Sequence, residues 1–376
     1  MLKDFNYLAL FIVTTLILGC HNSPTLKPVS LEQKIGQMLM VGFNGFSVVD
    51  SSHIKKDIAD YHLGGIILFD YNVPFQSSNR NIENPDQVKA LNRQLAELSS
   101  IPPFIAIDQE GGRVARLKPQ RGFPHHRSAQ YLGEIDNIDS TTYYASSQAK
   151  LLQDLGFNVN FAPVVDVNTN PDNPVIGQLE RSFSSNPDKV VEHASIFMDQ
   201  LEDHQILSVI KHFPGHGSAW NDSHVGMADV SNTWDESELI PYSSLVQSDR
   251  SFGVMTAHVF NNHLDDQDPA TLSYAVQTEL LRNQIGFDGI LFSDDMQMEA
   301  IRSFYGLEIS IEKAINAGVD ILVFGNNSIY DPQIVPKSVQ IIKDLINQGR
   351  ITEERIEESY QRIINTKEEL FEMDIQ

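Results

Sequence analysis

The feature that most constrains the fold of this chain is a unit that repeats from Leu31 onward: an amphipathic helix followed by a short apolar run. Eight such runs occur, at residues 38–41, 65–69, 104–107, 159–163, 207–210, 253–256, 289–292 and 320–324. Short apolar runs bounded by turn residues are typical of buried strands, and the intervening helices supply the crossovers that parallel strands need. The repeat therefore predicts an α/β fold, a single (β/α)8 barrel of the TIM type.

The pattern changes after the eighth run. Apolar residues at helical spacing continue over residues 339–346 and 356–371, with Gly349 between the two segments. We expect these segments to form helices that pack outside the barrel. A doubly wound open sheet is the competing architecture, but no G-x-G-x-x-G loop follows an early strand.

Composition limits the functional classes. The chain has 376 residues, 41% of them hydrophobic, which is enough for a large core. A net charge of −23 argues against a nucleic-acid partner, because phosphate contacts need clustered Lys and Arg. The single cysteine excludes an internal disulfide framework.

That cysteine, Cys20, ends an N-terminal apolar stretch over residues 7–18 that is too short to span a bilayer well. The run Leu-Ile-Leu-Gly-Cys that it closes resembles the lipobox of bacterial lipoproteins, which implies lipidation of Cys20. An ordinary signal peptide with a chance cysteine is the alternative. We expect a signal peptide at 1–20, a tether at 21–30 and a catalytic domain at 31–376, anchored in the cell envelope on the outer side of a bacterial membrane.

Polar residues follow the predicted strands at their carboxyl ends, where barrel enzymes place their active sites. These residues are Asp108, Asp166, Lys211, His212, His258, Asp294, Asp295 and Asn326. Any one of them could equally be a loop cap or a satisfied polar group. Their convergence on one face favours an active site.

The densest group lies at residues 211–224, where Lys211, His212, His216, Asp222 and His224 occur together. The Pro-Gly-His-Gly run at 214–217 excludes a regular helix. We expect a loop here, with Lys211 and His212 leaving the end of the fifth strand.

This set of groups suits glycoside hydrolysis, which needs a nucleophile or charge stabiliser and an acid/base across an acetal. Asp294 is the candidate for the first role. His224 is the candidate for the second, because imidazole titrates near neutral pH and Asp222 could orient it. If strand alternation persists, Asp295 points elsewhere and holds a neighbouring loop or a lysine.

Two long motifs carry a resemblance to a known family. The run from Lys211 to His224 matches K-H-[F/I]-P-G-[H/D]-G-x4-D-x-H, and the run from Leu280 to Asp294 is similar to a nucleophile signature. Both resemble the bacterial β-N-acetylglucosaminidases of glycoside hydrolase family 3, the NagZ-like group. Further agreement occurs at residues 108–114, 161–166, 181–183 and 255–258.

The resemblance implies a retaining β-N-acetylglucosaminidase without metal or cofactor. By it, Asp294 forms a covalent glycosyl-enzyme, and His224 with Asp222 is the acid/base dyad. The residues implied to hold the terminal N-acetylglucosamine of a glycan substrate are Asp108, Arg116, Arg181, Lys211 and His212. His216 is assigned to loop structure. Family 3 β-glucosidases take their acid/base from a second domain, for which we expect no room after the eighth strand.

Several alternatives stay open at this point. The chain could be a family 3 β-glucosidase, or a phosphorylase of N-acetylglucosaminides, since a histidine acid/base does not repel phosphate. A metal-dependent hydrolase could use His212, His216, Asp222 and His224 as ligands, although the Pro-Gly between them does not suit a helical zinc pair. A non-catalytic glycan-binding lipoprotein is the other class. The natural glycan, whether a muropeptide, a chitin oligomer or another, and the oligomeric state are not predicted.

Overall fold

The computed structural model describes residues 29–223, 226–373 and 375. The predicted signal peptide with Cys20, most of the tether, and His224 therefore lie outside the described residues.

Eight parallel strands form the centre of the molecule. In chain order they are β1 (Leu39–Gly42), β2 (Gly65–Leu68), β3 (Phe104–Ile107), β6 (Val159–Asn160), β7 (Leu207–Phe213), β9 (Phe252–Thr256), β11 (Leu291–Phe292) and β12 (Leu322–Phe324). β1 pairs with β12, and a bridge between Phe292 and Ile321 joins β11 to the start of β12. The sheet thus closes on itself, and the predicted (β/α)8 barrel of the α/β class is confirmed.

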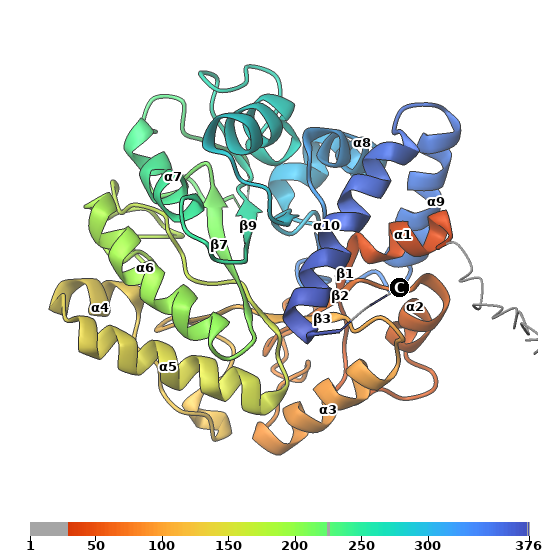
Figure 1. Cartoon of the computed structure of the whole chain (residues 1–376), viewed down its shortest axis with the longest axis horizontal. Helices are drawn as coiled ribbons and strands as arrows, with labels where there is room; N and C mark the ends of the chain where they lie inside the picture. Colours follow the sequence, from red (N-terminus) through yellow and green to blue (C-terminus); the bar gives the residue numbers. More distant parts are fainter. Residues whose placement is uncertain (1–28, 224–225, 374, 376) are drawn as a thin grey trace, which may run out of the picture.

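Helices surround the strands in Figure 1. They are α1 (Leu31–Gln37), α2 (His53–Tyr61), α3 (Pro85–Glu97), α4 (Ala129–Ile135), α5 (Ile138–Leu155), α6 (Pro187–Glu202), α7 (Ile240–Val246), α8 (Glu299–Ala317), α9 (Ile334–Asn347) and α10 (Glu353–Phe371). A π-helix, η4 (Ala275–Ile285), precedes β11, and the 3₁₀ turns are η1 (Pro119–Arg121), η2 (Glu236–Leu239) and η3 (Ala270–Leu272). Two small sheets, β4 (Gln109–Gly111) with β5 (Val114–Ala115) and β8 (Ala228–Asp229) with β10 (Val259–Phe260), decorate the connections.

Local sequence explains where several of these helices begin. Asn84, Asn137 and Thr352 each accept a backbone N–H of the first helical turn on a side-chain oxygen, which satisfies a donor that the helix itself cannot. None of the helices in the described part of the chain is long and apolar enough to cross a membrane.

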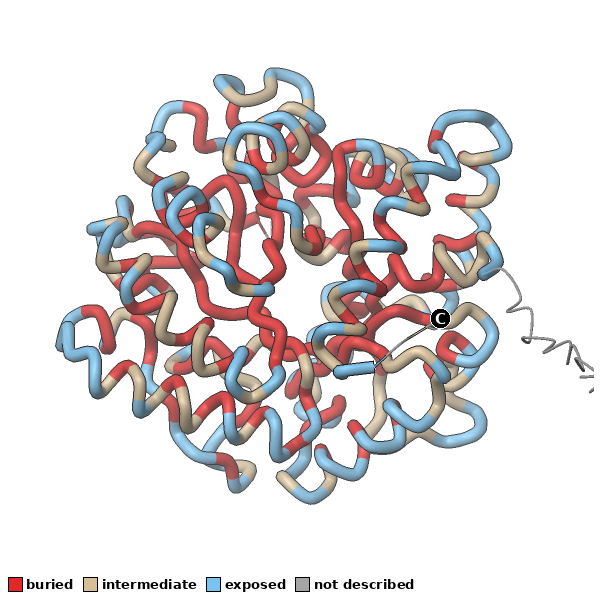
Figure 2. The backbone as a smooth tube through the Cα atoms, viewed as in Figure 1, coloured by how far each residue is buried: buried red, intermediate tan, exposed pale blue. Residues whose placement is uncertain are grey.

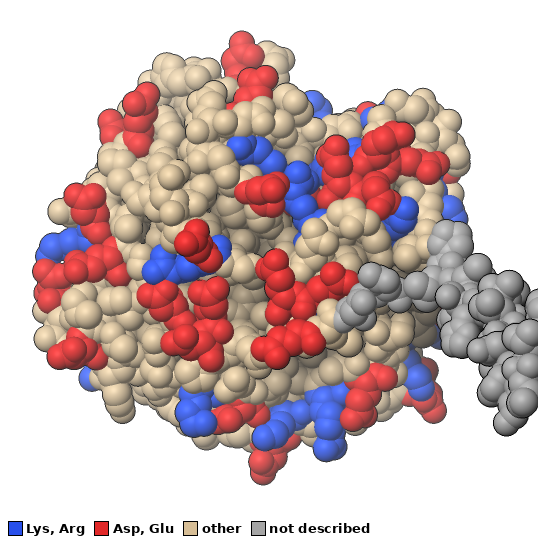
Figure 3. Space-filling model, in the orientation of Figure 1, with Lys and Arg blue, Asp and Glu red and all other residues tan. Residues whose placement is uncertain are grey.

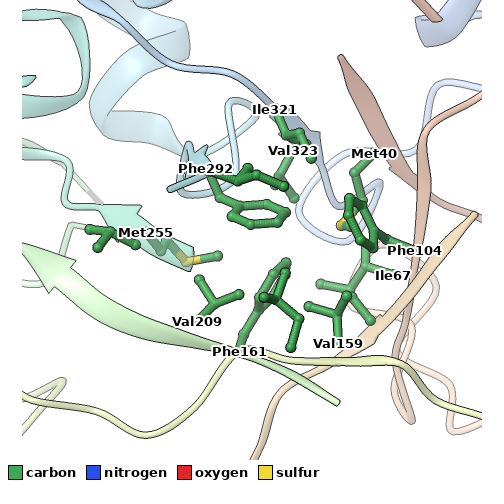
Figure 4. Close-up of a cluster of buried hydrophobic side chains, with 14 of the residues drawn as sticks. Met40, Ile67, Phe104, Val159, Phe161, Val209, Met255, Phe292, Ile321 and Val323 are labelled. Atoms are coloured by element: carbon green, nitrogen blue, oxygen red, sulfur yellow. The ribbon is translucent and has the colours of Figure 1, made fainter. Parts of the chain in front are cut away.

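The barrel interior is filled by apolar side chains from different strands. Figure 4 shows the rings of Phe104, Phe161 and Phe292 meeting at its centre, and the centroids of the last two are 5.5 Å apart. Figure 2 shows the buried backbone concentrated in the strands, whereas the helices turn exposed faces outward. The interior is thus a packed core, and ligands must bind at one of its ends.

The amino-terminal end of the barrel is covered by α10. Buried Lys367 donates from Nζ to Gln37 Oε1 at 2.8 Å and to the Gly64 carbonyl at 2.9 Å. Both acceptors lie beside the starts of barrel strands, so α10 packs against this end, whereas α9 packs beside α1, α2 and α8. The carboxyl-terminal end remains for a site.

We expect Asp320→Ala to lower the free energy of unfolding by about 3–5 kcal/mol, because it leaves buried positive charge unpaired. Asp320 is fully buried before β12. Its carboxylate accepts from the guanidinium groups of Arg282 at 2.6 Å, Arg355 at 3.3 Å and Arg362 at 3.4 Å. Urea denaturation would measure the loss, with exposed Asp344→Ala on α9 as the control. A loss below about 1 kcal/mol, the size of a surface pair, would contradict the role of Asp320.

Candidate active site

A pocket of about 220 Å³ opens at the carboxyl ends of the barrel strands. Its polar lining consists of Asp108, Glu110, Arg116, Arg181, Lys211, His212, Asp294, Asp295, Asn327 and Ser328. The volume is below the roughly 300–1,000 Å³ of pockets that enclose drug-sized ligands. The pocket therefore suits a polar ligand of single-ring size.

The prediction for the fifth strand needs a correction. β7 does not end at residue 210 but runs to Phe213, so Lys211 and His212 lie within the strand and not on the loop after it. Lys211 pairs with Met255 of β9, and its carbonyl accepts from Val165 N at 2.9 Å. The strand can continue because neighbours on both sides satisfy its backbone groups, which sequence periodicity alone does not reveal. Both side chains still reach the pocket.

One side of the pocket is a network of paired charges. Lys211, 2% exposed, donates to Asp108 Oδ1 at 2.8 Å and to Glu110 Oε1 at 2.7 Å. Arg116 donates to the other Asp108 oxygen at 3.1 Å, and Arg181 binds both Glu110 oxygens at 2.7 and 2.8 Å. Paired, forked contacts of this kind hold side chains in fixed orientations.

These pairings decide the protonation of the two carboxylates. Burial alone would raise the pKa of Asp108, but Lys211 and Arg116 outweigh it and hold that pKa below its ordinary value. Burial acts the same way on Glu110, and Arg181 and Lys211 together lower its pKa. Both groups are therefore ionised at neutral pH and serve as hydrogen-bond acceptors.

His212 is held neutral and in one tautomer. Its Nδ1 lies 2.7 Å from Asp166 Oδ2, and its Nε2 lies 3.2 Å from an Arg181 nitrogen. Because arginine only donates, Nε2 must accept and the imidazole proton sits on Nδ1. Burial, with Arg181 and Lys211 nearby, lowers the pKa of His212 well below its ordinary value. His212 is thus unsuited to donate a proton at neutral pH.

Asp294 follows β11 at the rim of the same pocket and is partly exposed. Its Oδ1 accepts from Asp295 N at 2.7 Å, and its own N–H donates to Thr256 Oγ1 at 3.3 Å. The adjacent Asp295 accepts on Oδ1 from Gly325 N, after β12, at 3.0 Å. Asp295 therefore holds a neighbouring loop, as predicted, but the expectation that it points away from the site is wrong, because it lines the same pocket as Asp294.

The structure brings together most of the residues that the sequence singled out. Asp294 and the predicted sugar-binding residues Asp108, Arg116, Arg181, Lys211 and His212 all line the pocket. Asp222 lies in the following loop and is not part of the lining, and His224 lies outside the described residues. Their roles remain predictions.

Three of the polar residues at strand ends do not line the pocket. Asp166 is buried beneath it and holds His212, while His258 contacts Thr271 Oγ1 at 2.8 Å. Asn326 donates to the Gly42 carbonyl at 2.9 Å and so links β12 to β1. These three residues therefore hold neighbouring segments in place at the carboxyl-terminal rim of the barrel.

Sequence reasoning missed Glu110, which is central to the charge network. Glu110 stands two residues after Asp108, so strand-like alternation would have placed both on one side. Phe69, whose ring lies 5.4 Å from the Arg116 guanidinium carbon, was missed as well. Nothing in its apolar run distinguishes a pocket residue from a core residue.

The predicted alternative of a metal site depends on how the candidate ligands are arranged. Among the residues that the structure describes, no group of three or more His, Cys, Asp or Glu side chains is arranged to hold an ion. The imidazoles of His212 and His216 have other partners: His212 Nδ1 lies 2.7 Å from Asp166 Oδ2, and His216 Nε2 lies 3.2 Å from Ser223 Oγ.

Lys211→Met should lower the free energy of unfolding at pH 7 by about 3–5 kcal/mol, because two buried carboxylates lose a shared partner. The low pKa values of Asp108 and Glu110 contribute stability above the ordinary carboxyl pKa of about 4, and that stability is lost as the pH falls below it. The variant should therefore lose less stability than the parent between pH 7 and pH 3. Urea denaturation across this range would measure both effects.

The control for this prediction is Lys150→Met, which removes an exposed pair with Asp154. It should shift stability by less than about 1 kcal/mol at either pH. A parallel pH dependence of Lys211→Met and the parent would contradict the coupling of Lys211 to the two carboxylates.

A closed (β/α)8 barrel with a polar pocket at its carboxyl end defines the class of TIM-barrel proteins that carry their site on this face. The family model described as Glycosyl hydrolase family 3 N terminal domain matches residues 30–366. The chain therefore belongs to glycosyl hydrolase family 3, and the family predicted from the motifs is confirmed.

Curated relatives agree with this assignment. Beta-hexosaminidase A of Pseudoalteromonas piscicida is 33% identical across 94% of this chain and 64% of its own length. Beta-hexosaminidase LpqI of Mycobacterium tuberculosis is 31% identical across 90% of this chain and 83% of its own length. The chain thus spans less than two thirds of the first of these relatives and most of the second.

Solved structures show the same similarity. A glycoside hydrolase family 3 beta-N-acetylglucosaminidase from Paenibacillus sp. str. FPU-7 matches with a TM-score of 0.83 and 33% identity, over 91% of this chain and 63% of that one. Mycobacterium tuberculosis LpqI matches with a TM-score of 0.77 and 29% identity, over 90% of this chain and 94% of that one.

Proposed function

We propose that this chain is a retaining β-N-acetylglucosaminidase that removes terminal, non-reducing N-acetylglucosamine. The observation that carries the proposal is that Asp294 shares one single-ring-sized pocket with a fixed network of charged groups. The names of the relatives, beta-hexosaminidases and a beta-N-acetylglucosaminidase, support the choice of sugar.

In this proposal the charge network holds the sugar. Asp108 is ionised and keeps acceptor capacity for hydroxyl groups, while Lys211 and Arg116 supply donors beside it. Arg181, held by Glu110 and His212, adds a further fixed donor. Groups whose positions are set before the substrate arrives lose little entropy on binding it.

The chemistry proceeds in two displacements. Asp294 attacks the anomeric carbon, forming a C–O bond as the glycosidic C–O bond breaks, and His224 gives its proton to the departing oxygen. Water then attacks the glycosyl-aspartate while His224 takes up a proton, so the sugar leaves with retained configuration. Asp222 orients His224 and favours its charged form.

The deciding experiment compares turnover of 4-nitrophenyl N-acetyl-β-D-glucosaminide with that of the matching β-glucoside, using residues 31–376 with and without a chelator. We expect a preference for the N-acetyl sugar that chelation does not change. Product analysis in phosphate buffer separates hydrolysis from phosphorolysis, because the latter yields the sugar 1-phosphate. Turnover of neither substrate, or activity lost with chelation, would overturn the proposal.

We further propose that the natural substrate is a cell-wall or chitin-type glycan outside the inner membrane, reached from a lipid anchor on Cys20. The net charge of −23 suits a domain kept away from an anionic membrane surface, and Figure 3 shows acidic side chains, with basic ones among them, on the face that carries α10. Turnover of peptidoglycan would fit such a location.

The anchor gives its own prediction. We expect the full chain to partition into the membrane fraction and Cys20→Ser to move into the soluble fraction, because lipid chains supply most of the attachment free energy. Labelling with a fatty-acid analogue should mark the parent and not the variant. Unlabelled parent protein in the soluble fraction would contradict the anchor.

A further inference from the structure

The loop after β7 is fixed at its base, from Pro214 to Ala219. The indole of Trp234 donates to the Pro214 carbonyl at 3.0 Å. Asn173 donates to the His216 carbonyl at 2.7 Å, and Asn170 donates to that of Ala219 at 2.9 Å. Side chains from other segments therefore hold the backbone at the base of the loop that leads to Asp222.

Glu238 of η2 lies beneath this base and is fully buried. Its Oε2 accepts from Gly217 N at 2.9 Å. A Cβ added to Gly215, whose φ is +121°, would lie 2.6 Å from the Glu238 Cβ. The backbone at 215–217 is thus pressed against the Glu238 side chain, and only glycine allows so close an approach at 215.

His216 stands between these two glycines and connects the base of the loop to its far end. Its Nε2 lies 3.2 Å from Ser223 Oγ, and both residues are buried. Ser223 is flanked in sequence by Asp222 and His224. A shift of the 215–217 backbone would therefore be transmitted through the imidazole to Ser223.

We propose that Glu238 is a positioning residue for the acid/base loop, acting through Gly215, Gly217 and the His216–Ser223 contact. Glu238 does not touch the pocket, so its effect on the reaction is indirect. The inference rests on the proposed function, because it concerns the step in which the leaving group is protonated.

The electrostatic surroundings of Glu238 predict a pH dependence of stability that can be measured independently of activity. Burial, with Asp166 nearby, raises the pKa of Glu238 to about 8. The titratable groups around it are Asp166, His216 of the loop and Tyr242 of α7, whose own pKa is raised by burial and by both carboxylates. The folded protein thus keeps a proton on Glu238 that the unfolded chain loses above its ordinary pKa of about 4.3. The stability linked to this proton is full below that pKa and is lost as the pH rises towards 8.

The test compares Glu238→Ala, Glu238→Gln and the parent on 4-nitrophenyl and phenyl N-acetyl-β-D-glucosaminides. Phenol leaves poorly without protonation, whereas nitrophenolate needs little. We expect Glu238→Ala to lower kcat/KM for the phenyl substrate at least tenfold more than for the nitrophenyl one. Glu238→Gln should retain most of the parent's kcat/KM for the phenyl substrate, since its amide oxygen can accept from Gly217 N. The melting temperature of Glu238→Gln relative to the parent should rise between pH 5 and pH 8.

Glu236→Gln, exposed on the same η2 turn, is the matched control and should change none of these quantities. Equal losses on both substrates, or a pH-independent difference in melting temperature, would overturn the inference. If Glu238→Ala does not fold, Ser223→Ala decides, because it removes the far contact with one small change and should show the same selectivity. Failure of the parent to turn over either substrate would instead reject the proposed function.

Discussion

Asp294→Ala is expected to lower turnover of every N-acetyl-β-D-glucosaminide by at least about 1,000-fold. The Asp294 carboxylate lines the pocket directly after β11, whereas that of the adjacent Asp295 accepts from Gly325 N. Removal of a nucleophile abolishes the covalent step whatever the leaving group. Good and poor leaving groups should therefore lose activity alike.

Chemical rescue sharpens this prediction. Azide added to Asp294→Ala should enter the vacated space and give a glycosyl azide of inverted configuration, detectable by NMR. The control is Asp288→Ala. The Asp288 side chain is exposed and precedes β11, so this variant should keep full turnover. Near-parental activity of Asp294→Ala would remove the nucleophile assignment.

The barrel could be predicted because its signal is local and repeated. Each strand is a short apolar run, and some of the intervening helices begin at a capping residue such as Asn84 or Asn137. The ends of the strands were harder to predict from the sequence. β7 continues through Lys211 and His212 because β9 and the segment around Val165 form hydrogen bonds with its backbone groups. Tertiary pairing of this kind leaves no trace in periodicity.

The pocket was predictable where chemistry-bearing residues stand at strand ends, as Asp108 and Asp294 do. It was not predictable where a partner is distant in sequence. Arg181 reaches Glu110 across 71 positions, and Asp166 fixes the tautomer of His212 across 46. Such pairs need the closed barrel to bring them together, so the ionised state of Asp108 and Glu110 and the tautomer of His212 could be read only from the structure, while the nucleophile role of Asp294 stays a prediction.

The state of the pocket residues narrows the source of the catalytic proton. Asp108 and Glu110 are kept ionised by Lys211 and their arginines, and His212 is neutral with its proton directed to Asp166. None of these groups can supply a proton efficiently at neutral pH, where a general acid needs a pKa near the working pH. We therefore expect the general acid to come from the loop after β7, where the sequence places His224 two residues after Asp222.

His224→Ala should consequently lower kcat/KM for poor leaving groups by about 100- to 10,000-fold, the range expected for loss of general acid catalysis. For 4-nitrophenyl N-acetyl-β-D-glucosaminide the loss in the same step should be far smaller, since nitrophenolate departs without a proton. The basic limb of the pH profile should also flatten, because His224 must be protonated to act as the acid. Equal losses for both kinds of leaving group, with an unchanged pH profile, would transfer the role to another residue and leave the glycosyl-aspartate at Asp294 to be tested by itself.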